Sequence, residues 1–350
     1  MPANFESNIN LVVNYLKSHP EISSREIYDN TLSGTTSYVT LKRLLADLIK
    51  RDFIITKGSG KGTKYLVSRA YQVILEIDPQ QYFEKETDDR LIQKDFNQNL
   101  IRDTLNKINL FSSQELEKLN NLQSVYREKL AKLSETEYKT DLERLAIDLS
   151  WKSAQIEGNT YSLLETERLL KDKETAGGKT KDEAVMLLNH KEAIDFLVAH
   201  PDYVKPLLLR AVEDIHSILI NDLGIERNIR RRSVGVSGTN YRPLDNEFLV
   251  KEAMAEMCGL VNLKENVFEK AFLILLLISY IQPFNDGNKR TARIISNAVL
   301  MVHQHCPLSF RTVNPMDYKK AMLIFYEQNN ISVFKKIFID QFEFAVNTYF

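Results

Sequence analysis

Hydrophobic residues recur at helical spacing along most of the chain, so the sequence predicts a mainly α-helical protein. The strongest pattern surrounds the polar stretch 281–293. An apolar run over 271–280 predicts a buried helix before it, and apolar residues at helical spacing between 294 and 300 predict a second helix after it. Pro283 ends the first helix because proline lacks the amide hydrogen that a helix needs. The sequence therefore places a polar loop between two buried helices.

The first 70 residues have a pattern of their own, three short helices followed by a hairpin. The strongest of these helices, over 40–51, is apolar on one face and basic on the other. Strand-like stretches at 54–56 and 65–67 flank a glycine-rich tip. The cations that we expect on the outer helix face and at the tip are Lys42, Arg43, Lys50, Lys57 and Lys61. Three helices and a hairpin in this order resemble a winged helix-turn-helix.

The pattern of the segment that follows predicts helices and a strand that pack, and it contains no candidate catalytic or binding residues. Alternating apolar residues over 71–77 predict a short strand, and the polar stretch 80–110 predicts a helix. Ser112 and Glu115 have the spacing of a capping box, which predicts that a further helix begins there.

Residues 228–244 have the alternation and turn chemistry of a small β-hairpin in an otherwise helical region. Val234 and Val236 are the alternating apolar positions, and Gly238 lies in the turn. Such a hairpin can bind an extended segment of another protein by adding a strand to its edge. The alternative is a plain surface hairpin with a basic foot at 230–232.

The polar loop itself has the residue types of an anion site. Gly287 and Asn288 tolerate a left-handed backbone, so consecutive amides there can form an anion-binding nest. The next helix begins at about Lys289, and the positive end of its dipole points into the same concavity.

Charged side chains complete this predicted site. Arg290 and Arg293 lie three residues apart, on one face of the second helix, and both can bind a polyphosphate. Asp286 is a hard oxygen ligand beside them, suited to a Mg²⁺ ion that is carried by phosphates. The residues alone therefore predict a loop that binds a magnesium polyphosphate.

Composition narrows the class of protein. Of the 350 residues, 43% are hydrophobic and 27% charged, which is typical of a globular protein, and the net charge is −1. Residues 1–70 carry ten Lys and Arg against six Asp and Glu, a balance of +4, so a nucleic-acid role is favoured for this segment alone. Two cysteines, no signal-peptide pattern and no long apolar run predict a cytoplasmic protein without a membrane segment.

The loop resembles the signature of the Fic (Fido) family, His-Pro-Phe-x-Asp/Glu-Gly-Asn-Gly/Lys-Arg-x-x-Arg. One position departs from it, because Gln282 stands where the family has its histidine. The matching positions are Pro283, Phe284, Asp286, Gly287, Asn288, Lys289, Arg290 and Arg293. By this resemblance Gln282, Asp286 and Asn288 fall at catalytic positions, and residues 287–290 with Arg293 at nucleotide-binding ones.

A second motif resembles the inhibitory helix of certain Fic proteins, in which Ser or Thr precedes a glutamate by four residues. Here Ser153 precedes Glu157, and Gly158 follows it. The resemblance implies that Glu157 pairs with Arg293 and obstructs the γ-phosphate of ATP, because a carboxylate competes with phosphate for the same donors. It also implies that the hairpin at 228–244 is a flap for a protein target, and leaves open whether Tyr241 contacts the base or the target.

Three functions stay open at this point. The first is a Fic-type protein adenylyltransferase that uses ATP and Mg²⁺ and is weak or atypical, since glutamine cannot accept a proton at neutral pH. The second is a catalytically silent ATP-binding regulator coupled to DNA through the N-terminal module. The third is a phosphotransferase resembling Doc toxins, suggested by Lys289 alone.

The expected organisation has three parts. Residues 1–75 form the winged helix-turn-helix, 76–140 a helical linker or packing segment, and 141–345 an all-helical Fic-type core with its inhibitory helix and β-hairpin flap. Winged helices also serve as protein-docking or dimerisation modules, so the sequence leaves a homodimer open.

Overall fold

The computed structural model describes residues 3–350, so the first two residues of the predicted 1–75 domain lie outside it. The chain divides into two compact units after Leu75, and helices dominate both, as predicted. The first unit contains α1 (Ala3–Ser18), α2 (Ser24–Thr31), α3 (Tyr38–Lys50), β1 (Ile54–Lys57), β2 (Lys64–Val67) and α4 (Arg69–Ile74).

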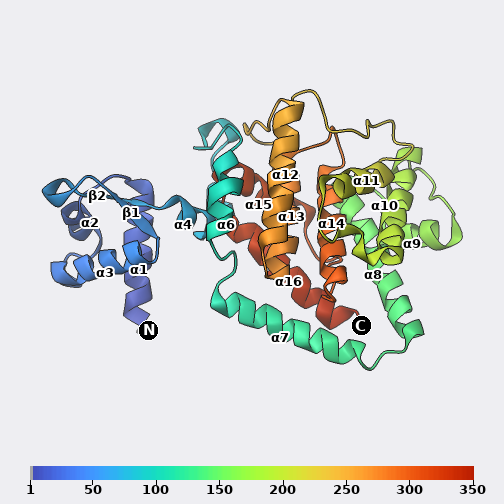
Figure 1. The fold of residues 1–350 in the computed structure, drawn as a ribbon, viewed down its shortest axis with the longest axis horizontal. Coiled ribbons are helices and arrows are strands. Elements are labelled where there is room, and N and C mark those ends of the chain that lie inside the picture. Colours follow the sequence, from blue (N-terminus) through green and yellow to red (C-terminus); the bar gives the residue numbers. More distant parts are fainter. Residues whose placement is uncertain (1–2) are drawn as a thin grey trace. The chain divides into compact units, whose positions relative to one another are not determined.

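The second unit is helical throughout its described elements (Figure 1). Its helices are α5 (Pro79–Tyr82), α6 (Leu105–Lys107), α7 (Ser113–Leu130), α8 (Glu135–Ile156), α9 (Leu163–Asp172), α10 (Lys181–Ala199), α11 (Leu209–Leu219), α12 (Glu247–Leu263), α13 (Val267–Ile281), α14 (Asn288–Val302), α15 (Pro315–Gln328) and α16 (Ser332–Thr348). Within residues 3–350, none of the helices is both long and apolar enough to cross a bilayer.

The first unit is built around its own apolar core. Leu41, Leu44, Leu45 and Leu48 of α3 are buried against α1, α2 and the hairpin, which confirms the predicted inner face of this helix. The predicted hairpin is also confirmed, because β1 and β2 pair antiparallel with Ile54 opposite Val67.

The strand predicted over 71–77 is wrong, because α4 occupies most of that stretch. Ser68 starts this helix, since its hydroxyl accepts a hydrogen bond from the Tyr71 amide at 3.0 Å. The Tyr71 ring then stacks on Phe53 with ring centroids 3.9 Å apart. A helix of six residues is too short for its apolar spacing to differ clearly from that of a strand.

The helix α13 forms the centre of the second unit, and every residue from Ala271 to Ile281 is buried, as the apolar run predicted. It packs against α12, α14 and α15, and α14 lies beside it in Figure 1. A helix that is apolar on all sides must be surrounded by other helices. The polar loop that joins α13 to α14 is therefore held between two buried helices, as predicted.

The helix predicted over 80–110 is wrong for most of its length, because the only helical segments between α5 and α6 among the described residues are a 3-10 turn at Thr87–Asp89 and a π-helical segment at Leu100–Thr104. Tertiary contacts hold this stretch instead. Arg90 Nη2 donates to Glu327 Oε1 of α15 at 3.0 Å, and the Tyr82 hydroxyl donates to the other oxygen of Glu327 at 2.6 Å. Glu327 is fully buried, so its carboxylate needs both of these partners, and they tie the stretch to α15.

Capping boxes begin the consecutive helices α7 to α10 of the second unit. The predicted box of Ser112 and Glu115 at the start of α7 is confirmed. Three more follow, which begin α8, α9 and α10 with Ser134 and Glu137, Ser162 and Glu165, and Thr180 and Glu183. In each box the hydroxyl and the glutamate satisfy helix-start amides that would otherwise lack partners.

Candidate functional site

The loop between α13 and α14 turns at two left-handed residues. Gln282 ends α13 with a φ of 51°, and Gly287 precedes α14 with a φ of 82°. A side chain at Gly287 would be strained at this φ, and its Cβ would lie 3.3 Å from Ile220 Cγ2. The α14 helix begins at Asn288, one residue before the expected start, so its first amides and the positive end of its dipole lie at the loop.

Asn288 braces this loop from inside. Its Oδ1 accepts a hydrogen bond from the Phe284 amide at 2.9 Å, and its Nδ2 donates to the Phe284 carbonyl at 2.9 Å. The same Nδ2 donates to Gln282 Oε1 at 3.0 Å. Because this buried amide is used within the protein, Asn288 shapes the loop rather than offering its side chain to a ligand.

Gln282 joins the two helix ends. Its Nε2 donates to the Ser279 carbonyl in the last turn of α13 at 2.5 Å, while its Oε1 accepts from Asn288. Both ends of the amide therefore already bind protein groups. An amide in this position can orient a neighbouring hydroxyl, but it cannot take a proton from it at neutral pH.

Two residues that the sequence did not mark as site residues support the loop. The His216 ring stacks on Phe284 with centroids 3.6 Å apart, and its Nε2 donates to the Asp286 carbonyl at 2.9 Å. Burial lowers the pKa of His216 to about 4, so the ring is neutral at pH 7. Arg230 is buried and donates from Nε to the Gln282 carbonyl at 2.5 Å, so the exposed basic foot expected at 230–232 is wrong for this residue.

The two loop arginines are both buried. Arg290 is 1% exposed and donates from Nη2 to Asp286 Oδ2 at 3.3 Å. Its Nε and Nη1 are buried without a hydrogen-bond partner among the described residues. Arg293 is completely buried and lies against the Tyr318 ring at 5.3 Å. An anionic ligand such as phosphate would supply acceptors for the unused donors of these buried guanidinium groups.

Glu157 ends α8 beside these arginines. Its Oε1 accepts from Arg293 Nη2 at 2.9 Å, and its Oε2 accepts from Lys289 Nζ at 3.1 Å. Burial alone would raise the pKa of Glu157, but the nearby Arg293 and Lys289 outweigh it and hold that pKa below its ordinary value. The carboxylate is therefore ionised at neutral pH and occupies two cations of the loop. The contact with Lys289 is one that the motif resemblance did not include.

Ser153 links Arg293 to a buried histidine. Arg293 donates from Nε to Ser153 Oγ at 2.8 Å and from Nη2 to the Ser153 carbonyl at 3.0 Å. Since arginine can only donate, the Ser153 hydroxyl accepts from Arg293 and donates its own hydrogen bond to His190 Nε2, which lies 2.7 Å away. Burial, and then the nearby Arg293 and Arg290, lower the pKa of His190 well below its ordinary value, so this ring is neutral.

Asp286 offers one exposed carboxylate at the mouth of the loop, with a side chain that is 65% exposed. In the described part of the chain, no three His, Cys, Asp or Glu side chains are arranged to hold a metal ion. A single carboxylate fits a Mg²⁺ ion that takes most of its ligands from phosphates and water.

Comparison with known proteins places this loop in a family. Residues 206–300 match the model of the Fic/DOC family. The chain contains a Fic domain. The protein adenylyltransferase Fic of Nematostella vectensis is 31% identical over 182 residues, which are 48% of this chain and 40% of that protein. That of Culex quinquefasciatus is 28% identical over 160 residues, 43% of this chain and 31% of that protein. The matches thus span less than half the length of these relatives.

Solved structures share the fold of the Fic domain and its surrounding helices. C. elegans Fic-1 superposes with a TM-score of 0.60 and 19% identity, over 68% of this chain and 72% of that one. A Fic domain containing signalling protein from Bacteroides thetaiotaomicron superposes with a TM-score of 0.55 and 19% identity, over 66% of this chain and 94% of that one.

The hairpin predicted as a flap of the Fic domain is wrong, because residues 228–244 contain no strand. The second arm bonds elsewhere. The backbone of Arg242 forms an isolated parallel β-bridge with that of Asp95, and the Gly238 carbonyl accepts from Arg90 Nη2 at 2.9 Å. The two arms therefore do not pair with each other, and the first arm, residues 228–236, contains no strand.

Tyr241 is not available to a nucleotide or a target in this structure. It is 2% exposed, and its hydroxyl donates to the Tyr280 carbonyl at 2.9 Å, so the expected contact is wrong and the residue anchors the segment to α13. Val234 and Val236, on the first arm, are half-buried. A separate hollow of about 410 Å³, between α7 and α16, is lined by none of the predicted site residues.

The predicted DNA-binding cations of the first unit differ in their surroundings. Lys42 is directed toward the Tyr65 ring at 5.7 Å, and Lys57 pairs with Glu21 at 2.8 Å. Arg43, Lys50 and Lys61 are exposed, and no ion pair of the described residues includes them. These three are therefore the cations best placed to neutralise an external anion.

Proposed function

We propose that the chain is a Fic-type protein adenylyltransferase, which moves AMP from ATP to a protein hydroxyl and does so weakly because Gln282 replaces the histidine base. The observation that carries the proposal is the pair of buried arginines, Arg290 and Arg293, at the start of α14. Arg290 has two unused buried donors, and ATP phosphates would satisfy them. Asp286 would hold a Mg²⁺ ion that neutralises phosphate charge.

The weak step is proton removal from the target. The histidines nearest the loop, His190 and His216, are both completely buried and bonded within the protein, so neither replaces the missing base. This observation also supports the second function, a silent ATP-binding regulator that is coupled to DNA. The positioning and electrostatic parts of the reaction are retained in either case.

The third function, phosphotransfer of the Doc type, has less support. Lys289 was its sole motivation, and this lysine pairs with Glu157 at 3.1 Å. A lysine that neutralises the proposed inhibitory carboxylate needs no other function to account for it.

A protein target would bind along the first arm, which carries Val234 and Val236. Because this arm has no strand partner among the described elements, its backbone groups are open to an incoming strand. The target hydroxyl would then be placed by backbone register rather than by side-chain recognition.

Replacing Glu157 with glycine is the direct test of the inhibitory contact. We expect Glu157→Gly to bind Mg-ATP about tenfold more tightly, because Arg293 and Lys289 are then free for the γ-phosphate. Titration calorimetry measures the affinity, and incubation with α-labelled ATP measures transfer. Glu157→Gln, which keeps the size of the side chain, should change the affinity in the same direction. If neither variant gained affinity or labelling, Glu157 would be an ordinary helix-end residue.

We further propose that residues 1–75 are a winged helix-turn-helix that binds duplex DNA through Arg43, Lys50 and Lys61. Three phosphate contacts predict a salt slope of about −2.7, so affinity should fall about 40-fold between 50 and 200 mM salt. Fluorescence anisotropy of the full chain with labelled duplex DNA measures this slope.

Matched variants separate specific from general charge effects on DNA binding. Replacing Arg43, Lys50 and Lys61 together by glutamine should abolish the salt-dependent binding. The same change at three exposed lysines of the second unit, Lys139, Lys171 and Lys251, should leave it intact. Absence of binding by the native chain at low salt would leave residues 1–75 as a protein-docking module.

A further inference from the structure

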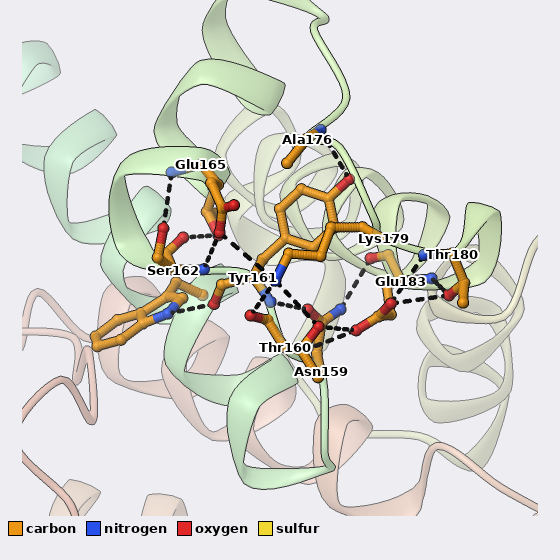
Figure 2. Close-up of polar contacts among 11 residues, drawn as sticks. Asn159, Thr160, Tyr161, Ser162, Glu165, Ala176, Lys179, Thr180 and Glu183 are labelled. Atoms are coloured by element: carbon orange, nitrogen blue, oxygen red, sulfur yellow. Dashed lines mark hydrogen bonds and ion pairs between the residues drawn. The ribbon is translucent and has the colours of Figure 1, made fainter.

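The connector that follows Glu157 is held by an unusual set of hydrogen bonds. Gly158 turns the chain with a φ of 99°, and the connector then enters α9 at Ser162. Figure 2 shows that polar side chains from the start of α10 converge on this connector. The position of the Glu157 carboxylate depends on this turn, because Glu157 is the C-terminal cap of α8.

Glu183 is the centre of that set. One of its oxygens closes the capping box of α10, where Oε2 accepts from the Thr180 amide at 2.9 Å. The other oxygen reaches a different segment, since Oε1 accepts from the Thr160 amide at 2.8 Å and from the Thr160 hydroxyl at 2.6 Å. The boxes of α8 and α9 need a single oxygen, because Glu137 and Glu165 each cap through Oε2 alone. Capping therefore accounts for only one of the two carboxylate oxygens of Glu183, and the other binds Thr160.

Neighbouring groups reinforce the same turn. Lys179 Nζ donates to the Thr160 carbonyl at 2.7 Å, and Asn159 Nδ2 donates to the Glu183 carbonyl at 2.9 Å (Figure 2). The Thr160 hydroxyl, and then the backbone amides, lower the pKa of Glu183 to about 2. The carboxylate is thus ionised across the physiological pH range and always available as an acceptor.

The same helix also supports the other side of Glu157. His190 lies about two turns beyond Glu183 on α10, and its ring bonds to Ser153, the residue that accepts from Arg293. The α10 helix therefore holds the inhibitory segment at Ser153 before Glu157 and at Thr160 after it.

We propose that Glu183 is a positioning residue which, through Thr160, holds the Glu157 carboxylate against Arg293 and Lys289. The proposal rests on the inhibitory role of Glu157 proposed above. Neutralising Glu183 removes the acceptor for the Thr160 amide or for the Thr180 amide, because a glutamine side chain has only one oxygen. The connector then loosens, Glu157 spends less time on Arg293, and ATP competes with it more easily.

The test uses Glu183→Gln in the full chain, with Glu137→Gln as the matched control. The control makes the same change in the capping box at the opposite end of α8. We expect Glu183→Gln to tighten Mg-ATP binding about three- to tenfold by calorimetry, and Glu137→Gln to change it less than twofold. In a Glu157→Gly background, Glu183→Gln should cause no further change, because the group that it positions is gone. Thr160→Val should reproduce the effect of Glu183→Gln.

Hydrogen exchange separates this proposal from the one on which it rests. Without nucleotide, amides of the connector 158–162 should exchange faster in Glu183→Gln than in the native chain or the control. Unchanged exchange would overturn the proposal whatever the function of the site. Faster exchange with unaltered ATP affinity, in a protein where Glu157→Gly does raise affinity, would also overturn it. Equal gains from Glu183→Gln with and without Glu157 would show that Glu183 acts on the site by another route, and would overturn it as well.

Discussion

A variant that combines Gln282→His with Glu157→Gly is expected to label itself with α-labelled ATP about 10²- to 10⁴-fold faster than Glu157→Gly alone. In the proposed transfer, a hydroxyl oxygen attacks the α-phosphorus, the bond to pyrophosphate breaks, and the hydroxyl proton needs an acceptor. An imidazole can accept it near neutral pH, whereas the Gln282 amide cannot. The Glu157→Gly background is chosen because ATP then has access to Arg293. Autolabelling reports the gain without knowledge of the natural target.

The position suits histidine structurally. Residue 282 ends α13 in a left-handed conformation, a backbone region in which histidine is enriched. Gln282→His does remove the hydrogen bonds to Ser279 and Asn288, so a control must separate base chemistry from loop loosening. Gln282→Ala serves, because it removes the same hydrogen bonds and supplies no base. Labelling should rise with histidine and not with alanine.

The outcomes distinguish the candidate functions. A gain with histidine over a nearly inactive native chain identifies a silenced transferase site and favours the regulator function for the native protein. Strong labelling by the native chain that histidine does not improve would mean that another residue acts as the base. If no variant labelled itself although calorimetry showed bound ATP, the adenylyltransferase proposal would be contradicted.

The site loop was predictable from local sequence because the segments beside it have strong sequence signals. The apolar run over 271–280 is buried on all sides, and Pro283 and Gly287 end one helix and begin the next. Capping boxes were equally readable, as at Ser112, since their hydrogen bonds join residues only three apart. Signals of this kind depend on nearby residues and survive in any tertiary context.

The errors came from contacts between residues far apart in the chain. In the stretch 80–110, Arg90 bonds to Glu327 on α15. In the segment 228–244, the backbone of Arg242 forms a β-bridge with Asp95 and not with the first arm of the expected hairpin. No local pattern contains such partners. The pairing of Lys289 with Glu157, and the support that His190 gives to Ser153, were missed for the same reason.

Replacing Arg290 by methionine is expected to weaken Mg-ATP binding about 30- to 5000-fold, the range for truncating one partner of a buried, hydrogen-bonded charge pair. Arg290 lies on the first turn of α14, is 1% exposed, and has two buried donors without a partner among the described residues. Methionine keeps most of the side-chain volume, so the packing against neighbouring helices changes little. Titration calorimetry in the Glu157→Gly background measures the loss free of competition from Glu157.

The thermal stability of Arg290→Met is a second, independent test of the loop as the nucleotide site. A buried guanidinium with unused donors costs free energy in the absence of its anion, so the methionine variant should melt no lower than the native chain without nucleotide. Added Mg-ATP should then raise the melting temperature of the native chain and not that of the variant, because a ligand stabilises only the protein that binds it. Arg311→Met is the matched control, since it removes an arginine that pairs with Asp148 at 3.1 Å and should leave ATP affinity unchanged. Undiminished ATP binding by Arg290→Met would contradict the assignment of this loop as the nucleotide site.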